Sequence, residues 1–352
     1  MIYSKLKPFR FPDRLEALAA GRTGSPVHIR VKPINACNDS CWYCAYRADG
    51  LELGSLMDQR DRLSDAKLAE LAEDFIAMGV RAVTFSGGGE PLLHPKTAAT
   101  ARRLAEGGIH VAALTNGAFL SGETAEVFSS RASWVRVSMD AWDEESHIAS
   151  RRSKPGEFGR IMDNLAAFAA RGGPCELGVS FIVSEKNAGR LHEAARLIKD
   201  AGARHLKLSA CVVSNSGSEN NAYFRRIAPE VDRQLELCRK LEDDRFSVID
   251  HFHEAGERFD KPYRSCAMLE LLTVVGADGG VYTCQDKAYT DSGLLGSIKE
   301  RSFKDLWASA ECRARRAAID PSAHCLHHCV GHEKNKLLDE FLSLDRGHDS
   351  FV

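Results

Sequence analysis

The chain has 352 residues, of which 44% are hydrophobic and 27% charged, and its formal net charge is −2. This composition supplies a sizeable core, and the small net charge excludes recognition of nucleic acid or anionic membranes by charge alone. No stretch approaches the ~18 apolar residues of a membrane span, and the first residues lack the apolar segment of a secretion signal. We therefore expect a cytoplasmic protein that does not contact a membrane.

Short apolar strands alternate with amphipathic helices along most of the chain. Strands are predicted at 27–34, 81–91, 110–117, 134–141, 176–184 and 205–211. Helices are predicted at 64–79, 97–108, 121–132, 158–173, 188–202 and 229–244. This alternation is typical of a parallel sheet covered by helices. Six strand–helix units suit a partial barrel or an open doubly wound sheet, and both place chemistry at the carboxyl ends of the strands.

The chain divides by composition into segments, which we predict as an N-terminal extension (1–25), the strand–helix region (26–225), a linker helix (226–259), a cysteine-containing region (260–335) and a tail (336–352). Within this scheme the polar segment 214–226 is predicted as a loop. The cysteine-containing region has little regular periodicity. We expect bound metal to organise it.

Cysteine usage gives the first indication of chemistry. A reducing cytoplasm rarely keeps structural disulfides, so clustered cysteines more often bind metal or react. Eight of the eleven cysteines fall in two clusters, Cys37, Cys41 and Cys44 near the start and Cys266, Cys284, Cys312, Cys325 and Cys329 near the end. The remaining Cys175, Cys211 and Cys238 are expected mainly as small buried hydrophobes.

The first cluster offers three thiolates from one short loop. Three thiolates can hold three irons of a cubane cluster and leave the fourth iron open to an outside ligand. Zinc is the rival, although structural zinc sites usually draw four ligands from paired motifs. One strand later, glycines 87–89 let the backbone approach a ligand closely, and Glu90 can accept from an ammonium. A plain tight turn is the alternative for these glycines.

The Cys37-x3-Cys41-x2-Cys44 loop, followed by the Gly-Gly-Gly-Glu-Pro segment at 87–91, closely resembles the radical S-adenosylmethionine (radical SAM) enzymes. The resemblance covers about residues 27–211 and includes the order of strands and helices. It implies a partial (β/α)6 TIM-like barrel and a [4Fe–4S] cluster held by the three cysteines. The open iron would bind the methionine part of SAM.

The same resemblance implies further contacts to SAM. They are Tyr43 at the adenine, Gly88, Gly89 and Glu90 at the methionine ammonium, Ser138 and Asp140 at the ribose or carboxylate, and Arg152, or its neighbour Arg151, at the carboxylate. For the two arginines, a solvated helix start is an equally good interpretation.

The late cysteines are similar to the SPASM/twitch extensions that hold auxiliary iron–sulfur clusters. The resemblance implies a smaller C-terminal α+β domain with one auxiliary [4Fe–4S] cluster, ligated by Cys266, Cys284, Cys325 and Cys329. The Cys-x2-Cys pair of the full SPASM pattern is missing, and Cys312 is an alternative ligand. A zinc site that uses Cys325, Cys329 and one of the nearby histidines His324, His327 and His328 is the competing interpretation.

The resemblance implies reductive cleavage of SAM to a 5′-deoxyadenosyl radical, which abstracts a hydrogen atom from the substrate. We predict net oxidation aided by the auxiliary cluster, with Asp286 as a candidate base and a flavodoxin- or ferredoxin-type protein as reductant. An epimerase with Cys211 as hydrogen-atom donor is the main alternative. Only 36 residues precede Cys37, which favours a small-molecule or sugar-like substrate over a peptide (RiPP-type) one. A non-catalytic iron–sulfur protein for electron transfer or sensing is the remaining alternative.

Overall fold

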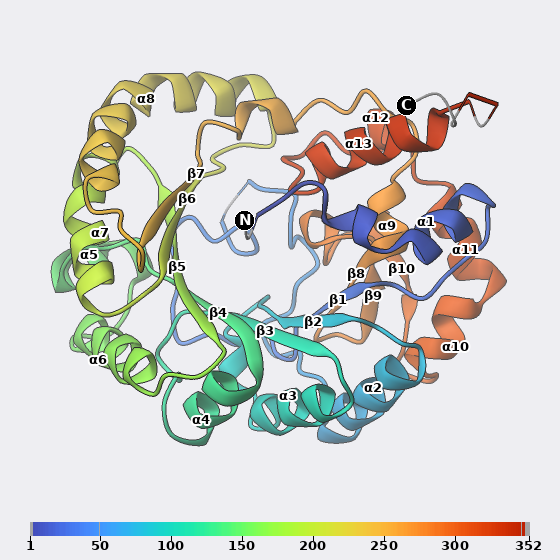
Figure 1. Cartoon of the computed structure of the whole chain (residues 1–352), viewed down its shortest axis with the longest axis horizontal. Helices are drawn as coiled ribbons and strands as arrows, with labels where there is room; N and C mark the ends of the chain where they lie inside the picture. The colour runs from blue at the N-terminus through green and yellow to red at the C-terminus, as the bar shows by residue number, and fades with distance from the viewer. Residues whose placement is uncertain (1–2, 49, 346, 349–352) are drawn as a thin grey trace.

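The computed structural model describes residues 3–48, 50–345 and 347–348. Its strands form one sheet in the order β10-β9-β8-β1-β2-β3-β4-β5-β6-β7, and the sheet curls into a partial barrel (Figure 1). The strands are β1 (His28–Val31), β2 (Ala82–Phe85), β3 (His110–Thr115), β4 (Ala132–Ser138), β5 (Glu176–Val183), β6 (His205–Ala210), β7 (Ser247–His251), β8 (Leu272–Val275), β9 (Gly280–Tyr282) and β10 (Leu294–Ser297). Strands β8 and β1 to β7 run parallel, whereas β9 and β10 continue the sheet antiparallel.

Helices cover the outer face of the curled sheet (Figure 1). The helices are α1 (Pro12–Ala19), α2 (Asp65–Ala77), α3 (Thr97–Glu106), α4 (Gly122–Arg131), α5 (Glu144–Arg151), α6 (Glu157–Ala170), α7 (Leu191–Asp200), α8 (Gly217–Arg239), α9 (Ala267–Leu271), α10 (Phe303–Ala308), α11 (Ala310–Ala317), α12 (Pro321–His324) and α13 (His332–Ser343). As predicted, Ser64 caps α2 by accepting a hydrogen bond from the Lys67 amide.

Alternation along the strands separates the two faces of the sheet. In β4, Val135 and Val137 are fully buried in the main core, whereas Arg136 and Ser138 are only partly buried. Strand β6 repeats the pattern, with buried Leu206 and Leu208 beside a partly buried Lys207. Because successive side chains of a strand point to opposite faces, the barrel interior receives the polar residues.

The sheet is larger than the six predicted strands, all of which are present. Strand β7 extends it beyond β6, and β8 pairs in parallel with β1. The first strand of the cysteine-containing region is therefore part of the barrel sheet. Local sequence does not reveal this pairing, because its two strands lie more than two hundred residues apart in the chain.

The predicted loop at 214–226 is wrong from Gly217 onward, where α8 begins. Ser216 caps this helix by accepting from the Glu219 amide, and Tyr223 and Phe224 bury one face of it. The predicted linker 226–259 accordingly contains the end of α8 and all of β7.

Both predicted terminal segments contain helices. Helix α1 packs against α9, and a small core formed by Leu15, Val27, Ala267, Leu271 and Leu338 joins them to α13. Residues 1–2 of the extension and 346 and 349–352 of the tail lie outside the described residues. Among the described residues, no helix is both long enough and apolar enough to cross a membrane.

Candidate functional site

The first cysteine loop follows β1 at the carboxyl end of the sheet. Cys37, Cys41 and Cys44 are free and partly exposed. The Cys44 amide donates to the Cys41 carbonyl at 3.2 Å, which forms a tight turn. The Arg47 guanidinium then donates to two backbone carbonyls of the same loop, those of Asn35 at 2.9 Å and Asp39 at 3.1 Å. The protein itself therefore holds the loop that presents the three thiols.

Two thiols of this loop have raised pKa values. Burial raises the pKa of Cys37 to about 12 and the pKa of Cys41 to about 11. Both thiols are protonated at neutral pH, and metal binding must release those protons. Three soft sulfur donors on one loop fit an iron–sulfur cluster with one open iron.

Two glycines of the segment after β2 lie directly against the cysteine loop. A Cβ atom on Gly89 would lie 2.0 Å from the Ala36 carbonyl oxygen, and one on Gly88 would lie 2.1 Å from Asn35 Oδ1. Only glycine lets the two backbones approach this closely. The contact of Gly88 and Gly89 with SAM remains a prediction, whereas their packing against the loop is a second reason for their presence.

Glu90 is buried and joins the ends of two strands. Its carboxylate accepts hydrogen bonds from the Thr115 hydroxyl (2.7 Å), the Asn116 amide (2.7 Å) and the Leu92 amide (3.0 Å). Burial raises the pKa of Glu90 to about 7 despite these bonds. The structure thus gives Glu90 a positioning role beside β3, and its predicted contact with the methionine ammonium stays a prediction.

A buried ion network connects the cysteine loop to β4. Arg151 donates to Asp39 Oδ2 at 3.1 Å and to Asp140 Oδ2 at 2.6 Å, and all three side chains are almost fully buried. The Tyr43 hydroxyl also donates to Asp140, and Asn116 Nδ2 donates to Asp39 at 3.2 Å. This network fixes Tyr43 and Asp140 beside the cysteines.

The late cysteines converge from three segments. Cys266 precedes α9, Cys284 follows β9, and Cys325 and Cys329 lie in the loop between α12 and α13. Asn335 Nδ2 donates to Cys266 Sγ at 3.4 Å. Burial, together with neighbouring charges that include other thiols of the set, raises the pKa of Cys266 to about 11 and the pKa of Cys329 to about 12. Thiolates are the usual ligands of iron–sulfur clusters, and ligation of one auxiliary cluster by these four cysteines stays a prediction.

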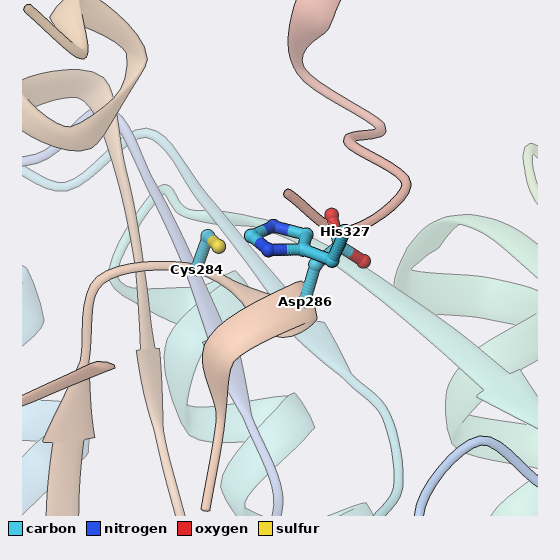
Figure 2. Close-up of side chains that lie close together, drawn as sticks. All are labelled: Cys284, Asp286 and His327. Carbon is cyan, nitrogen blue, oxygen red and sulfur yellow. The ribbon is translucent and has the colours of Figure 1, made fainter. Parts of the chain in front are cut away.

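Asp286 and His327 lie beside Cys284 (Figure 2). One possible ligand atom from each of these residues lies within 4.8 Å of the others. Asp286 also accepts a hydrogen bond from the Val330 amide at 3.2 Å, and burial raises its pKa. The competing zinc interpretation named His327 as a possible ligand, and the structure places it beside Cys284.

A cavity of about 350 Å³ lies between the two cysteine sites. Ala45, next to Cys44, lines it from the first site, whereas Asp286 and His327 line it from the second. Arg136 and Lys207 line it from the barrel interior. Residues next to both cysteine sites therefore line one cavity of the size that small ligands occupy.

Comparison with known families matches both halves of this arrangement. The model of the radical SAM superfamily matches residues 31–184, and that of the SPASM iron–sulfur cluster-binding domain matches residues 266–330. The chain is a radical SAM enzyme with a SPASM-type domain. These domains imply a SAM-binding [4Fe–4S] cluster, SAM itself and auxiliary iron–sulfur binding.

Individual relatives resemble this radical SAM enzyme to different extents. AdoMet-dependent heme synthase of Methanosarcina barkeri is 25% identical over 315 residues, which cover 82% of this chain and 84% of that protein. GTP 3′,8-cyclase of Xanthomonas campestris pv. campestris is 35% identical over 162 residues, 45% of this chain and only 46% of the cyclase.

Solved structures share the fold. Streptococcus suis SuiB bound to its precursor peptide SuiA superposes with a TM-score of 0.65 at 15% identity, over 93% of this chain and 74% of that one. The enzyme anSMEcpe with bound AdoMet superposes with a TM-score of 0.57 at 19% identity, over 82% of this chain and 83% of that one.

Other predicted residues of this radical SAM enzyme occupy distinct positions. Ser138 lines the cavity. Arg152 is exposed in a left-handed conformation (φ 52°) at the end of α5. Of the two candidate arginines, it is Arg151 that belongs to the buried network. Cys211 is 2% exposed in the main core and does not line the cavity. Cys312 is buried in that core, where its sulfur accepts from Arg316 at 3.1 Å.

Sequence reasoning missed Asp39 and Asn116, which complete the network around the first site. Asp39 lies inside the cysteine motif, and Asn116 lies in the Thr-Asn-Gly turn that ends β3. Their position at strand ends was a usable signal. Their partners become visible only when β1, β3 and β4 are brought together.

Proposed function

We propose that this radical SAM enzyme oxidises a small polar or sugar-like molecule by removing a hydrogen atom, a proton and an electron from it. The observation that carries the proposal is a cavity lined by residues next to both cysteine sites. A volume of about 350 Å³ suits a small ligand. Two curated relatives bear names that refer to small molecules, GTP and heme.

Cys37, Cys41 and Cys44 would hold the SAM-binding cluster, and Cys266, Cys284, Cys325 and Cys329 would hold one auxiliary cluster. When bound, these groups and SAM supply a 5′-deoxyadenosyl radical that takes a hydrogen atom from an unactivated C–H bond, and an electron acceptor beside the product radical. The chain itself positions the substrate and excludes water. Arg151 holds Asp140, which accepts from Tyr43, and these residues would support bound SAM beside the first cysteine loop.

Asp286 is the candidate base at the other end of the cavity. It lines the cavity two residues after Cys284, and burial raises its pKa. A carboxylate oxygen of Asp286 receives the proton that leaves the substrate as it is oxidised. An Asp286→Asn variant should retain SAM cleavage and lose product formation.

The reductant is proposed to be a flavodoxin- or ferredoxin-type protein of the cytoplasm. All eleven cysteines are free, which suits a reducing compartment.

The test begins with anaerobic reconstitution of both clusters, chemical reduction and addition of SAM. We expect 5′-deoxyadenosine to form, and candidate small molecules to yield a product two hydrogens lighter by mass analysis. No 5′-deoxyadenosine from fully loaded, reduced protein would instead favour an electron-transfer or sensing protein.

Cys211→Ala separates oxidation from epimerisation. Because Cys211 does not line the cavity, the variant should oxidise substrate as well as the wild type does. Loss of product with accumulation of a trapped substrate radical would support an epimerase.

A further inference from the structure

The interior of the barrel carries a cluster of positive charge on its cavity wall. Arg136 projects from β4 and Lys207 from β6, and Arg258 joins them from the segment after β7. Arg136 and Lys207 occupy inward-facing positions of their strands, where partial burial alternates with fully buried neighbours. Both side chains therefore reach the same cavity from two strands of one sheet.

These charges lack the partners that buried cations usually have. In the described part of the chain, neither Arg136 nor Lys207 forms an ion pair with a carboxylate, and Arg136 Nε is buried without a hydrogen-bond partner. The nearby carboxylate of Glu254 is already engaged by Arg258. Burial, reinforced by Arg136, Arg258 and Arg30, lowers the pKa of Lys207 to about 7. Even partly buried cations lose favourable hydration, and a nearby opposite charge offsets that cost.

The iron–sulfur sites do not account for this pair of charges. Lys261, by contrast, lies in the field of the Cys329 and Cys325 thiols, and Arg30 in that of Cys284, so both can balance a cluster. The largest charge effects on Lys207 come from Arg136, Arg258, Arg30 and Glu254. Within the residues that the structure describes, both side chains therefore line the cavity without an ion pair that occupies them.

Tyr3 supports the cationic wall from the N-terminal segment. Its hydroxyl accepts a hydrogen bond from Arg136 at 2.5 Å, and the Lys207 ammonium lies 5.7 Å from the centre of its ring. The ring also packs edge-on against His205 and His251. This packing orients Arg136 without neutralising it.

Side chains with hydroxyl and amide groups line the cavity next to the two cations. Ser138 and Ser180 lie in register beside Lys207 across β4, β5 and β6, and Ser209 and Asn215 line the cavity nearby. Donors of this kind suit a ligand rich in oxygen atoms.

We propose that the substrate of this site carries a carboxylate or phosphate group that binds between Arg136 and Lys207. The inference rests on the proposed function, because it names the substrate class of the same cavity. Charge-assisted hydrogen bonds to the two cations hold the anionic group on the barrel wall. The rest of the substrate then lies between the two cysteine sites.

The test measures binding of three matched probes, glucose 6-phosphate, glucuronate and glucose, to reconstituted protein in the presence of SAM. Isothermal titration should show at least about tenfold tighter binding of one anionic probe than of glucose. The better of the two anionic probes identifies phosphate or carboxylate. Equal affinity for all three probes, including undetectable binding of each, would overturn the proposal.

Variants connect the binding to the two residues. Arg136→Gln and Lys207→Gln should each weaken the anionic probe about tenfold or more, and Lys207→Arg should restore much of the loss. Arg204→Gln, which removes an exposed cation just before β6, is the matched control and should bind as the wild type does. Wild-type affinity in both cavity variants would contradict the assignment.

Iron content and melting temperature show whether each variant folds. If a glutamine variant does not fold, the affinity of Lys207→Arg protein for the anionic probe is compared with that of the wild type instead. Formation of 5′-deoxyadenosine is measured in parallel. If it is absent from wild-type protein that still prefers the anionic probe, the proposed enzyme function fails while the charge assignment stands. If 5′-deoxyadenosine forms but the wild type does not prefer an anionic probe, the charge assignment fails and the proposed enzyme function stands.

Discussion

The two cysteine sites are built in different ways. The first lies on one short loop at the end of β1, held by Arg47 and by the buried network around Arg151. The second gathers four thiols from segments spread over residues 266–329, between short helices and turns. A site held by protein contacts should survive without metal, whereas a site assembled from separate segments should depend on it. The following predictions test this difference.

The largest effect is expected from Cys41→Ala in the first site. A cluster with one of its three protein ligands removed cannot be held for SAM, so 5′-deoxyadenosine formation should fall to background. Iron should fall from ~8 to ~4 per chain, because the auxiliary cluster remains. Cys175→Ser, at a partly buried cysteine outside both sites, should keep both values, and cleavage of SAM by Cys41→Ala protein would refute the ligand assignment.

Iron removal should separate the two sites structurally. After chelation, amide hydrogen exchange should rise strongly in the short segment around Cys325 and Cys329 (320–331) and little in the loop at 37–47, because the buried ion network holds that loop without metal. Hydrogen-exchange mass spectrometry measures both regions in one sample. Equal loss of protection in the two regions would remove the distinction.

Replacing Arg151 by Met tests the network that supports the first site. The change leaves Asp39 and Asp140 buried without their cation, so the free energy of unfolding should fall by about 3–5 kcal/mol. The matched control is Arg102→Met, which breaks an exposed pair with Glu123 and should cost no more than ~1 kcal/mol. Denaturant unfolding of both variants measures the difference, and equal losses would show that the network is not a special support.

The smallest expected effect is the pH dependence of stability that comes from His28 in β1, the strand that pairs with β8. Burial, with the charges of Arg30, Lys334 and Lys7, lowers the pKa of His28 to about 3. The unfolded histidine binds a proton near pH 6.5 and the folded one does not, so stability is lost as the pH falls from about 7 toward 3. Between pH 7.5 and 5.5 the loss from His28 should be about 1–2 kcal/mol.

His28→Gln should remove that part of the pH dependence, whereas His110→Gln, at an exposed position of β3, should leave it unchanged. Denaturant titrations at the two pH values compare the slopes. An unchanged slope in His28→Gln would contradict the assignment.

Much of this molecule could be predicted from local patterns. The six strand–helix units, the cap at Ser64 and the spacing of Cys37, Cys41 and Cys44 are all readable within a few residues of sequence. The pairing of β8 with β1 and the bond from Arg151 to Asp39 join distant parts of the chain, so no local pattern predicts them.

The cationic wall is an intermediate case. Arg136 and Lys207 each alternate with apolar residues along a strand, which predicts that they face away from the helices. Only the curled sheet shows that both then face the same cavity.

The most direct test of the account is the response of each cluster to SAM. Reduced protein is examined by electron paramagnetic resonance with and without SAM, in the wild type, in Cys41→Ala and in Cys284→Ala. The account predicts that SAM changes the spectrum of the wild type and of Cys284→Ala, because the first cluster keeps an open iron, and leaves that of Cys41→Ala unchanged. A SAM-dependent change in Cys41→Ala, which retains only the auxiliary site, would contradict it.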